Sequence, residues 1–252
     1  MSSPSRRFPM RTTTIPTLLC ALALSAACED PSEAVPTATV NEPGTEAEAN
    51  EAEASEAEAS AEGAAEEQNA AREVLAFGPD GSSIGWVGSK VTGSHEGGFR
   101  EFSGEIAFDP ADPTRSRVSV TIDATSLFAD DPDLTDHLKT GDFFETERFP
   151  QARFVTTAIA EGGEGEATHT LTGDLTLHGE TKSISFPATV GVTDAAVTAR
   201  AEFSINRRDF GINYDGRAND LIRDGVVIRL DLRAPRGATT VAGENPASPT
   251  EG

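Results

Sequence analysis

Histidines and cysteines, which commonly take part in catalysis or bind metals, are few in this chain of 252 residues, and its many carboxylates show no metal-ligand spacing with them. The four histidines, His95, His137, His169 and His178, lie in different segments, and none forms the close His-x-x-x-His type of pair that binds zinc. We expect His137 to be a buried packing residue. The sequence contains no phosphate-binding loop either. We therefore predict no catalytic residue, no metal site and no cofactor belonging to the protein itself.

Acidic side chains dominate, with 42 Asp and Glu against 20 Lys and Arg and a formal net charge of −22. Proteins that bind nucleic acids need an excess of Lys and Arg, because each phosphate that they contact has to be neutralised. The charge balance therefore excludes a nucleic-acid partner. It says nothing about oligomeric state, which we leave open.

The two cysteines, Cys20 and Cys28, lie close to a segment typical of secretion signals. Three arginines precede an apolar stretch from Ile15 to Ala27, which ends in small residues. Residues 25–28 (SAAC) resemble a bacterial lipobox, although Ser25 stands where leucine is usual. We predict that residues 1–27 are a lipoprotein signal peptide and that Cys28 is acylated. The membrane is then a partner, and the protein is anchored in the cell envelope, facing the periplasm or the exterior. An ordinary cleaved signal is the alternative.

An acidic, Ala/Glu-rich segment follows at residues 28–73. Its part from Glu29 to Ala71 holds 13 carboxylates and no Lys or Arg. Residues 46–60 repeat a five-residue unit (EAEAN-EAEAS-EAEAS), which has no apolar stripe and no cation to pair with its glutamates. A helical rod is the competing interpretation, but we predict a disordered tether. Residues 235–252 lack periodicity and are predicted to be a disordered tail.

The folded domain is predicted at residues 74–234, where apolar and polar residues alternate along segment after segment. This pattern predicts an all-β fold. One segment, residues 134–144, has helical spacing instead, with Thr135 as a possible N-cap and Gly141 as a possible stop. We therefore expect a short helix between the third and fourth of eight strands. The expected strands are 84–92, 102–108, 118–122, 152–159, 171–177, 184–192, 197–205 and 226–232.

Eight consecutive antiparallel strands with one dry face most simply close into a barrel, because closure removes exposed edges. A two-sheet sandwich is the alternative. The predicted inner face includes small residues, namely Gly104, Gly173, Ala188, Ala199 and Ala201. These favour an internal cavity, although glycine and alanine also relieve crowding where strands coil.

Four motifs in the folded domain resemble those of the YceI-like family of secreted bacterial proteins. They are the segments 86–104 (beginning WVGSKVTGSH), 136–150 (beginning DHL, with DFF), 171–181 (LTGDLTLHGET) and 206–212 (NRRDFGI). The resemblance covers roughly residues 83–234. It implies a lipocalin-like, eight-stranded antiparallel barrel whose interior receives an isoprenoid chain, either a polyprenyl lipid or the tail of a quinone. A filled barrel that acts as an envelope interaction module, without a ligand, is the alternative.

The residues expected to contact such a chain are the large apolar ones on the predicted inner face. They are Trp86, Phe102, Ile106, Phe108, Val118, Val120, Ile122, Phe154, Leu175, Phe203 and Leu230. For any one of them, ordinary core packing is the alternative. A polar head group would need a rim of cations or hydrogen-bond donors, for which the candidates are Lys90, His95, Arg207 and Arg208. Local pairing of an arginine with Asp209 is the alternative here.

Overall fold

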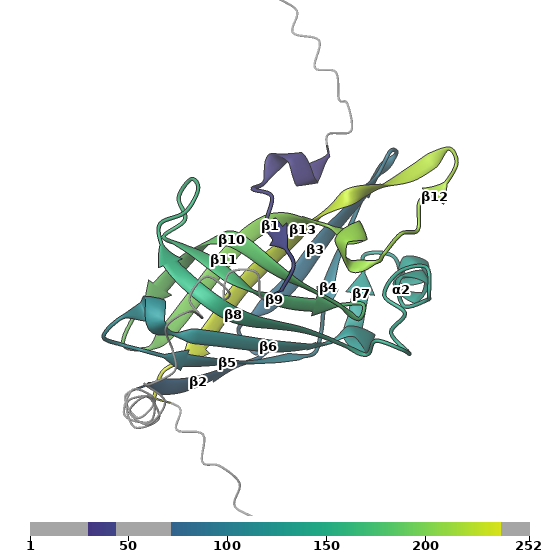
Figure 1. The fold of residues 1–252 in the computed structure, drawn as a ribbon. Coiled ribbons are helices and arrows are strands. Elements are labelled where there is room, and N and C mark those ends of the chain that lie inside the picture. Colours follow the sequence, from purple (N-terminus) through teal and green to yellow (C-terminus); the bar gives the residue numbers. More distant parts are fainter. Residues whose placement is uncertain (1–29, 44–71, 238–252) are drawn as a thin grey trace, which may run out of the picture.

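The computed structural model of the chain describes residues 30–43 and 72–237 (Figure 1). The predicted signal peptide, Cys20, Cys28, the Ala/Glu repeat and the end of the predicted tail lie outside the described residues. Among the helices of the described part, none has both the length and the apolar character needed to cross a bilayer.

The described chain forms a sheet of thirteen strands, and eleven of them follow one another along an antiparallel path. In spatial order these are β2 (Glu73–Phe77), β5 (Phe102–Phe108), β6 (Arg117–Asp123), β8 (Gln151–Glu161), β9 (His169–Leu177), β10 (Glu180–Val192), β11 (Ala196–Asn206), β13 (Asp220–Pro235), β3 (Ser83–Lys90), β4 (Gly93–Phe99) and β7 (Leu127–Ala129). Two short strands lie off this path: β1 (Thr39–Asn41) pairs with β10, and β12 (Gly216–Arg217) pairs with β13.

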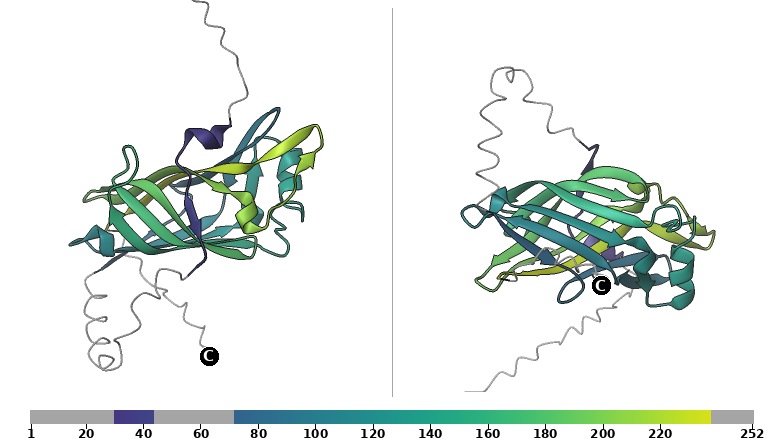
Figure 2. Two further views of the ribbon diagram at one scale, coloured as in Figure 1. Left: turned by 45° about the horizontal axis from the view of Figure 1, so that its top comes forward. Right: turned by 90° about the horizontal axis from the view of Figure 1, so that it is seen from below.

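The sheet curls round on itself, so that its first strand approaches the far end of β13 (Figure 2). This seam is held by side chains rather than by a strand ladder. Arg236, which follows β13, donates from Nε to Glu73 Oε2 in β2 at 2.8 Å, and its guanidinium lies 5.4 Å from the centre of the Phe108 ring. The predicted all-β, antiparallel barrel is therefore confirmed, and all eight predicted strands are present.

The backbone conformations of two turn residues explain the hairpin between β9 and β10. Leu177 of β9 is paired with Glu180 of β10, so the loop between them is only His178-Gly179. Both residues have positive φ, 52° and 81°. A two-residue loop with two left-handed residues matches the natural twist of a hairpin, and glycine adopts that conformation without steric cost.

The predicted helix is present, but its bounds and its caps differ from the expectation. It is α2 (Pro132–Leu138), and its N-cap is Asp131, whose side chain accepts hydrogen bonds from the amides of Asp133 and Leu134. An Asp-Pro pair is a good helix start because proline needs no hydrogen-bond partner at the first position. Thr135 therefore lies inside the helix, and the helix ends before Gly141. Four short 3-10 helices are η1 (Pro31–Ala34), η3 (Pro113–Arg115), η4 (Ala124–Ser126) and η5 (Arg207–Phe210).

Residues 30–43 correct part of the predicted tether. We expected disorder from residue 28 to residue 73, but this stretch contains η1 and β1 and packs on the barrel wall. Ala38 is only 4% exposed. The acidic composition of the whole tether concealed this short apolar part. At the other end, β13 continues to Pro235, so the fold extends slightly into the predicted tail.

Candidate binding cavity

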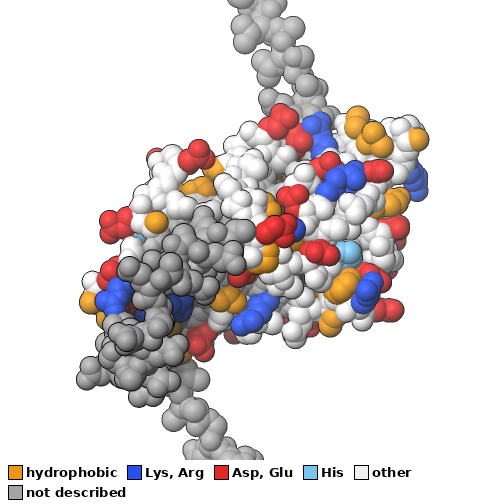
Figure 3. All heavy atoms as spheres, in the orientation of Figure 1, with side chains coloured by type: hydrophobic (Ala, Val, Ile, Leu, Met, Phe, Trp, Pro, Cys, Tyr) orange, Lys and Arg blue, Asp and Glu red, His pale blue; other side chains and the backbone are white. Residues whose placement is uncertain are grey.

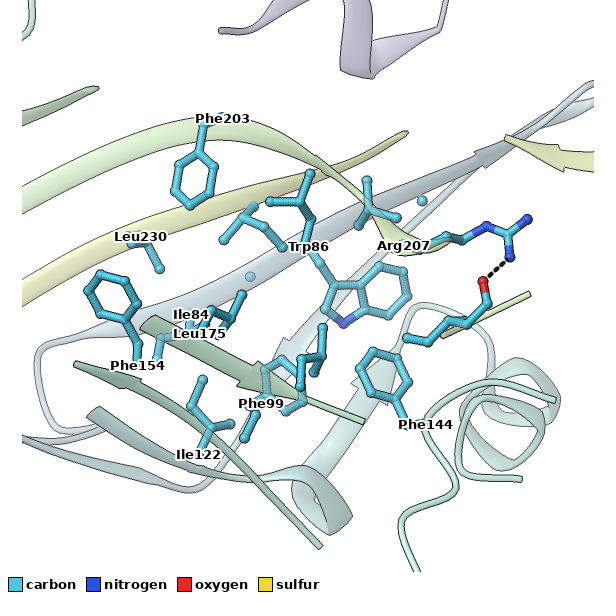
Figure 4. Close-up of a pocket in the computed structure, with 18 of the residues that line it drawn as sticks. Ile84, Trp86, Phe99, Ile122, Phe144, Phe154, Leu175, Phe203, Arg207 and Leu230 are labelled. Carbon is cyan, nitrogen blue, oxygen red and sulfur yellow. Dashed lines mark hydrogen bonds between the residues drawn. The ribbon is translucent and has the colours of Figure 1, made fainter. Parts of the chain in front are cut away.

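The barrel encloses a cavity of about 530 Å³ (Figure 4). Its lining is mostly apolar and comes from β3, β4, β5, β6, β8, β9, β10, β11 and β13, as well as from α2, β12 and the loops at one end. The volume falls in the range of typical small-molecule sites. An apolar lining of this kind can bind hydrocarbon, because burial removes the hydrocarbon surface from water.

The cavity is elongated along the strands. On β11 both Val197 and Ile205 line it. Eight residue steps along a strand correspond to ~26 Å at ~3.3 Å per residue. A cavity of this shape suits a chain better than a compact, round molecule.

Nine of the eleven predicted contact residues line the cavity, and the structure places them on seven different strands. These nine are Trp86, Ile106, Val118, Val120, Ile122, Phe154, Leu175, Phe203 and Leu230. The remaining two, Phe102 and Phe108, do not. Both are buried in the part of the core that also holds Leu75 and Phe77 of β2. Strand β2 was not anticipated from the sequence; it pairs with β5, which carries both phenylalanines, and its apolar residues share their core cluster.

The small inward residues divide into two groups. Ala188, Ala199 and Ala201 line the cavity, so they do leave space, as we expected. Gly104 and Gly173 do not line it. A Cβ at Gly173 would lie 2.6 Å from Cζ of Phe154, and one at Gly104 would collide with the Phe77 ring. These two glycines therefore accommodate aromatic rings, and the expectation that they leave empty volume is wrong.

Two of the four predicted rim residues, Lys90 and His95, lie at the mouth of the cavity, where each is paired with a carboxylate. Lys90 Nζ lies 2.7 Å from Asp220 Oδ2, and His95 Nδ1 lies 2.9 Å from Asp130 Oδ1. The hydrogen bond from Lys90 lowers the pKa of the Asp220 carboxyl below its ordinary value. Both Lys90 and His95 line the cavity, and each already has a carboxylate partner.

Arg207 is a buried residue that holds the mouth together. It is 4% exposed, and its guanidinium donates to the carbonyl oxygens of Ile212 at 2.7 Å and Arg223 at 3.1 Å (Figure 4). A third bond, of 3.1 Å, reaches Asp224. Burial lowers the pKa of Arg207, and the charge of Asp224 opposes that effect. Its donors are thus used within the protein, although its side chain lines the cavity.

Arg208 lies outside the cavity, which corrects the fourth rim prediction. Its guanidinium bonds to Asp224 at 2.7 Å and also to Asp215. Both bonds raise its pKa. The local pairing that we considered was with Asp209, but the partners come from the following loop and from β13.

His137 also differs from the expectation, because its side chain is 40% exposed rather than buried. Its Nε2 lies 2.9 Å from Asp142 Oδ2, and its ring meets Phe143 and Tyr214 edge to face, with centroids 5.0 Å and 5.3 Å apart. Together with Phe144, these rings form an aromatic side of the mouth.

Much of this mouth was missed by sequence reasoning. Its residues come from α2, from the turns that follow it and from the loop after β11, where no alternation marks an inner face. The spacing of Leu134 and Leu138 was the available signal, since both line the cavity on one side of α2. Arg217, on β12, also lines the mouth, and its side chain makes no hydrogen bond or ion pair with another described residue.

Catalytic and metal chemistry finds little support in the described residues. They contain no group of three or more His, Cys, Asp or Glu side chains suited to hold a metal ion. Residues 81–85 (GSSIG) have the spacing of a nucleophile elbow. However, Ser83 is the first residue of β3, whereas that motif requires a strand-to-helix turn.

Comparison with known proteins identifies the domain. The family model described as the YceI-like domain matches residues 76–234. A UPF0312 protein of Pseudomonas putida (strain W619) is 36% identical over 132 residues, which cover 50% of this chain and 68% of that protein. The crystal structure of Burkholderia cenocepacia BcnA shares the fold, with a TM-score of 0.56 and 29% identity over 62% of this chain and 98% of that one. A more distant structure, with a TM-score of 0.49 and 16% identity over 65% of this chain and 99% of its own, is described as a polyisoprenoid binding domain from Saccharophagus degradans.

Proposed function

This chain belongs to the YceI-like family, and from that premise we propose that it is a binding or carrier protein that holds an isoprenoid chain inside its barrel. The chain would be a polyprenyl lipid or the tail of a quinone. The observation that carries this proposal is the elongated cavity of about 530 Å³ with its apolar lining. It agrees with the cargo that the sequence motifs implied.

Affinity in such a site comes from the tail rather than from a charged anchor. Each CH₂ group that moves from water into the barrel contributes ~0.8 kcal/mol. The cations that we considered for the head group are already paired or lie outside the cavity, as described for Lys90, His95, Arg207 and Arg208. We propose that the head group stays at the mouth, between the aromatic side formed by Phe143, Phe144 and Tyr214 and the hairpin that carries Arg217.

The alternative, a filled barrel that acts through its surface, is disfavoured by the cavity itself. The face drawn in Figure 3 shows acidic and basic side chains interspersed with small apolar patches over the described residues. That face, where described residues are in view, shows no large continuous apolar area, which is one mark of a surface that docks another protein. We therefore propose that the protein binds its ligand in the cavity inside the barrel and does not act through its surface.

We further propose that acylation of Cys28 anchors the protein in the cell envelope, where its cargo is found. Several acyl chains in one molecule give stable anchoring, whereas one chain does not. The basis is the lipobox-like sequence at residues 25–28. Substitution Cys28→Ala is expected to move the protein from the membrane fraction to the soluble fraction. Unchanged partitioning would mean that Cys28 is not acylated.

Tail binding can be measured through Trp86, which is the single tryptophan of the chain and lines the cavity. The delipidated protein is titrated with geranylgeraniol while the emission of Trp86 is recorded. A saturated straight-chain alcohol of the same length is the comparator. We expect a saturable change with geranylgeraniol and a weaker response to the comparator. A flat titration with geranylgeraniol contradicts the proposal.

A further inference from the structure

The barrel wall has a split between two of its strands. β10 and β11 are paired at only one end, where Thr189 to Val192 face Val197 to Arg200. Beyond that point, β10 is bonded to β9 and β11 is bonded to β13. In the described structure no ladder joins Glu180–Ala188 of β10 to Ala201–Asn206 of β11. Residues on both sides of the split, including Phe186 and Phe203, line the cavity.

A segment from the N-terminal side of the chain fills this split. We call residues 36–41 the strap. Its second half, β1, pairs antiparallel with β10 through Thr39 opposite Ser185 and Asn41 opposite Ser183. Its first half bonds to β11: Ala38 N donates to Ser204 O at 2.8 Å, and Ser204 N donates to Pro36 O at 2.8 Å. Figure 1 and Figure 2 show this purple segment lying across the green strands.

The inner side chains of the strap pack against core residues from both sides of the split. Ala38 is 4% exposed, and it packs with Val40 in the same cluster as Phe186 and Phe203. The rings of Phe186 and Phe203 are stacked with centroids 4.1 Å apart, and both face the cavity. These two rings come from opposite sides of the split, so they must separate along with the strap when the split opens.

Polar contacts fasten the strap at both of its ends. On the N-terminal side, Asp30 pairs with Arg223 at 3.1 Å, and it also accepts a bond from Ser32 at 2.7 Å. On the C-terminal side, Glu42 pairs with Lys182 at 2.5 Å. In sequence, residues 44–71 separate the strap from the first strand of the barrel path. The strap can therefore leave the wall without unpairing any strand of that path.

We propose that the strap is a lateral gate through which the isoprenoid tail enters and leaves the barrel. This inference rests on the proposed function and adds its regulation. The strap pairs with β10 over only three residues and with β11 through one bridge, whereas β11 and β13 pair along the whole length of β11, so the strap opens at a lower cost than that ladder. A tail that enters through the open split can move sideways into the cavity. It need not be threaded past the polar pairs Lys90–Asp220 and His95–Asp130 at the mouth.

A reversible lock tests the gate directly. Thr39→Cys and Ser185→Cys are introduced together into the full chain carrying Cys20→Ser and Cys28→Ser. The two positions are direct cross-strand partners, and the separation of such partners suits a disulfide. Loading of geranylgeraniol is followed by the emission of Trp86. We expect the oxidised protein to load at least tenfold more slowly than the reduced one, and dithiothreitol to restore the rate.

A second pair of variants releases the strap instead of locking it. Ala38→Asp places a charge in the buried strap position and is expected to speed loading at least tenfold, because an unpaired buried carboxylate is strongly unfavourable. Thr39→Asp adds the same charge at the neighbouring exposed position and is expected to change nothing. Circular dichroism checks that the barrel itself is folded. If Ala38→Asp does not fold, the comparison of the oxidised and reduced disulfide variant tests the gate by itself.

The outcomes separate the gate from the binding function. Equal loading rates in the oxidised and reduced protein, with saturable binding in both, overturn the gate while the proposed function stands. No saturable binding in any variant, including the reduced protein, overturns the proposed function and the gate with it. Slow loading that is specific to the oxidised protein supports both.

Discussion

A larger side chain at Ala201 should block the cavity without harming the fold. Ala201 lies on β11 between Ala199 and Phe203 and lines the middle of the cavity. In Ala201→Phe the new ring would project into space that a tail otherwise occupies. If the ring displaces three to four CH₂ groups at ~0.8 kcal/mol each, affinity falls by ~2.4–3.2 kcal/mol, which is about a hundredfold in Kd.

The same substitution distinguishes a real cavity from a packed core. In a packed interior the added ring would cost ~1–3 kcal/mol of stability through overpacking. We expect instead that the free energy of unfolding of Ala201→Phe is at least that of the wild type, because the ring fills empty apolar space. Titration with geranylgeraniol measures the affinity, and urea unfolding measures the free energy of unfolding.

Glu202→Phe is the matched control, since it adds the same ring on the neighbouring, outward-facing position of β11. Glu202 is exposed and bonds to Arg229, so the control loses only a surface ion pair. Its affinity for geranylgeraniol should equal that of the wild type. The reasoning is refuted if Ala201→Phe binds as tightly as Glu202→Phe, or if Ala201→Phe is destabilised by overpacking.

Three further predictions concern the parts that shape the cavity. Gly173→Ala should destabilise the fold by ~1–3 kcal/mol in urea unfolding, because its Cβ would lie 2.6 Å from Cζ of Phe154; an unchanged midpoint would contradict the ring-packing role of this glycine. Arg207→Met should cost about 2–3 kcal/mol, since it leaves the carbonyl of Ile212 without its donor; stability equal to the wild type would show that the mouth does not depend on this residue. Although burial acts to raise the pKa of Asp30, hydrogen bonds from Ser32 and Arg223 hold it below its ordinary value. Because this pKa is lowered, ionised Asp30 stabilises the folded strap at pH values above the unfolded-state pKa of ~3.9. That stabilisation is lost as the pH falls from this value through the lower pKa of the folded state. Acid should therefore reduce the hydrogen-exchange protection of the strap amides, and Asp30→Asn should reduce it in the same way at pH 7. Full protection of the strap in this variant would show that Asp30 does not hold the strap in place.

The barrel strands could be predicted because each one buries one face and exposes the other. Alternation at a period of two is a direct consequence of that arrangement. Strand β4 was missed because its segment (GSHEGGF) shows no such alternation. At Gly97 the indole of Trp86 lies so close that a Cβ would be 2.5 Å from Cζ2. The apolar face of this strand is supplied by a neighbouring side chain, which the local sequence does not reveal.

The cavity wall could be predicted for the same reason, and the mouth could not. Residues such as Ile122, Phe154 and Leu230 point inward as members of alternating strands. Tyr214 and Phe143 reach the mouth from loops, whose paths depend on tertiary contacts such as the bonds of Arg207. The strap escaped notice because a short apolar element was embedded in a long acidic segment. The net charge of that segment favoured disorder, whereas the packing of Ala38 and Val40 in the core and the backbone bonds of the strap to β10 and β11 fix its place.

The most direct test of an isoprenoid carrier is to identify what the protein holds when it is purified under mild conditions. Lipid is extracted from the full-length wild type and from Ala201→Phe, and both extracts are analysed by mass spectrometry. We predict one recurring isoprenoid lipid in an amount comparable to the wild-type protein, and its loss from Ala201→Phe. The same lipid in equal amounts in both proteins, or no lipid in the wild type, would contradict binding inside the barrel.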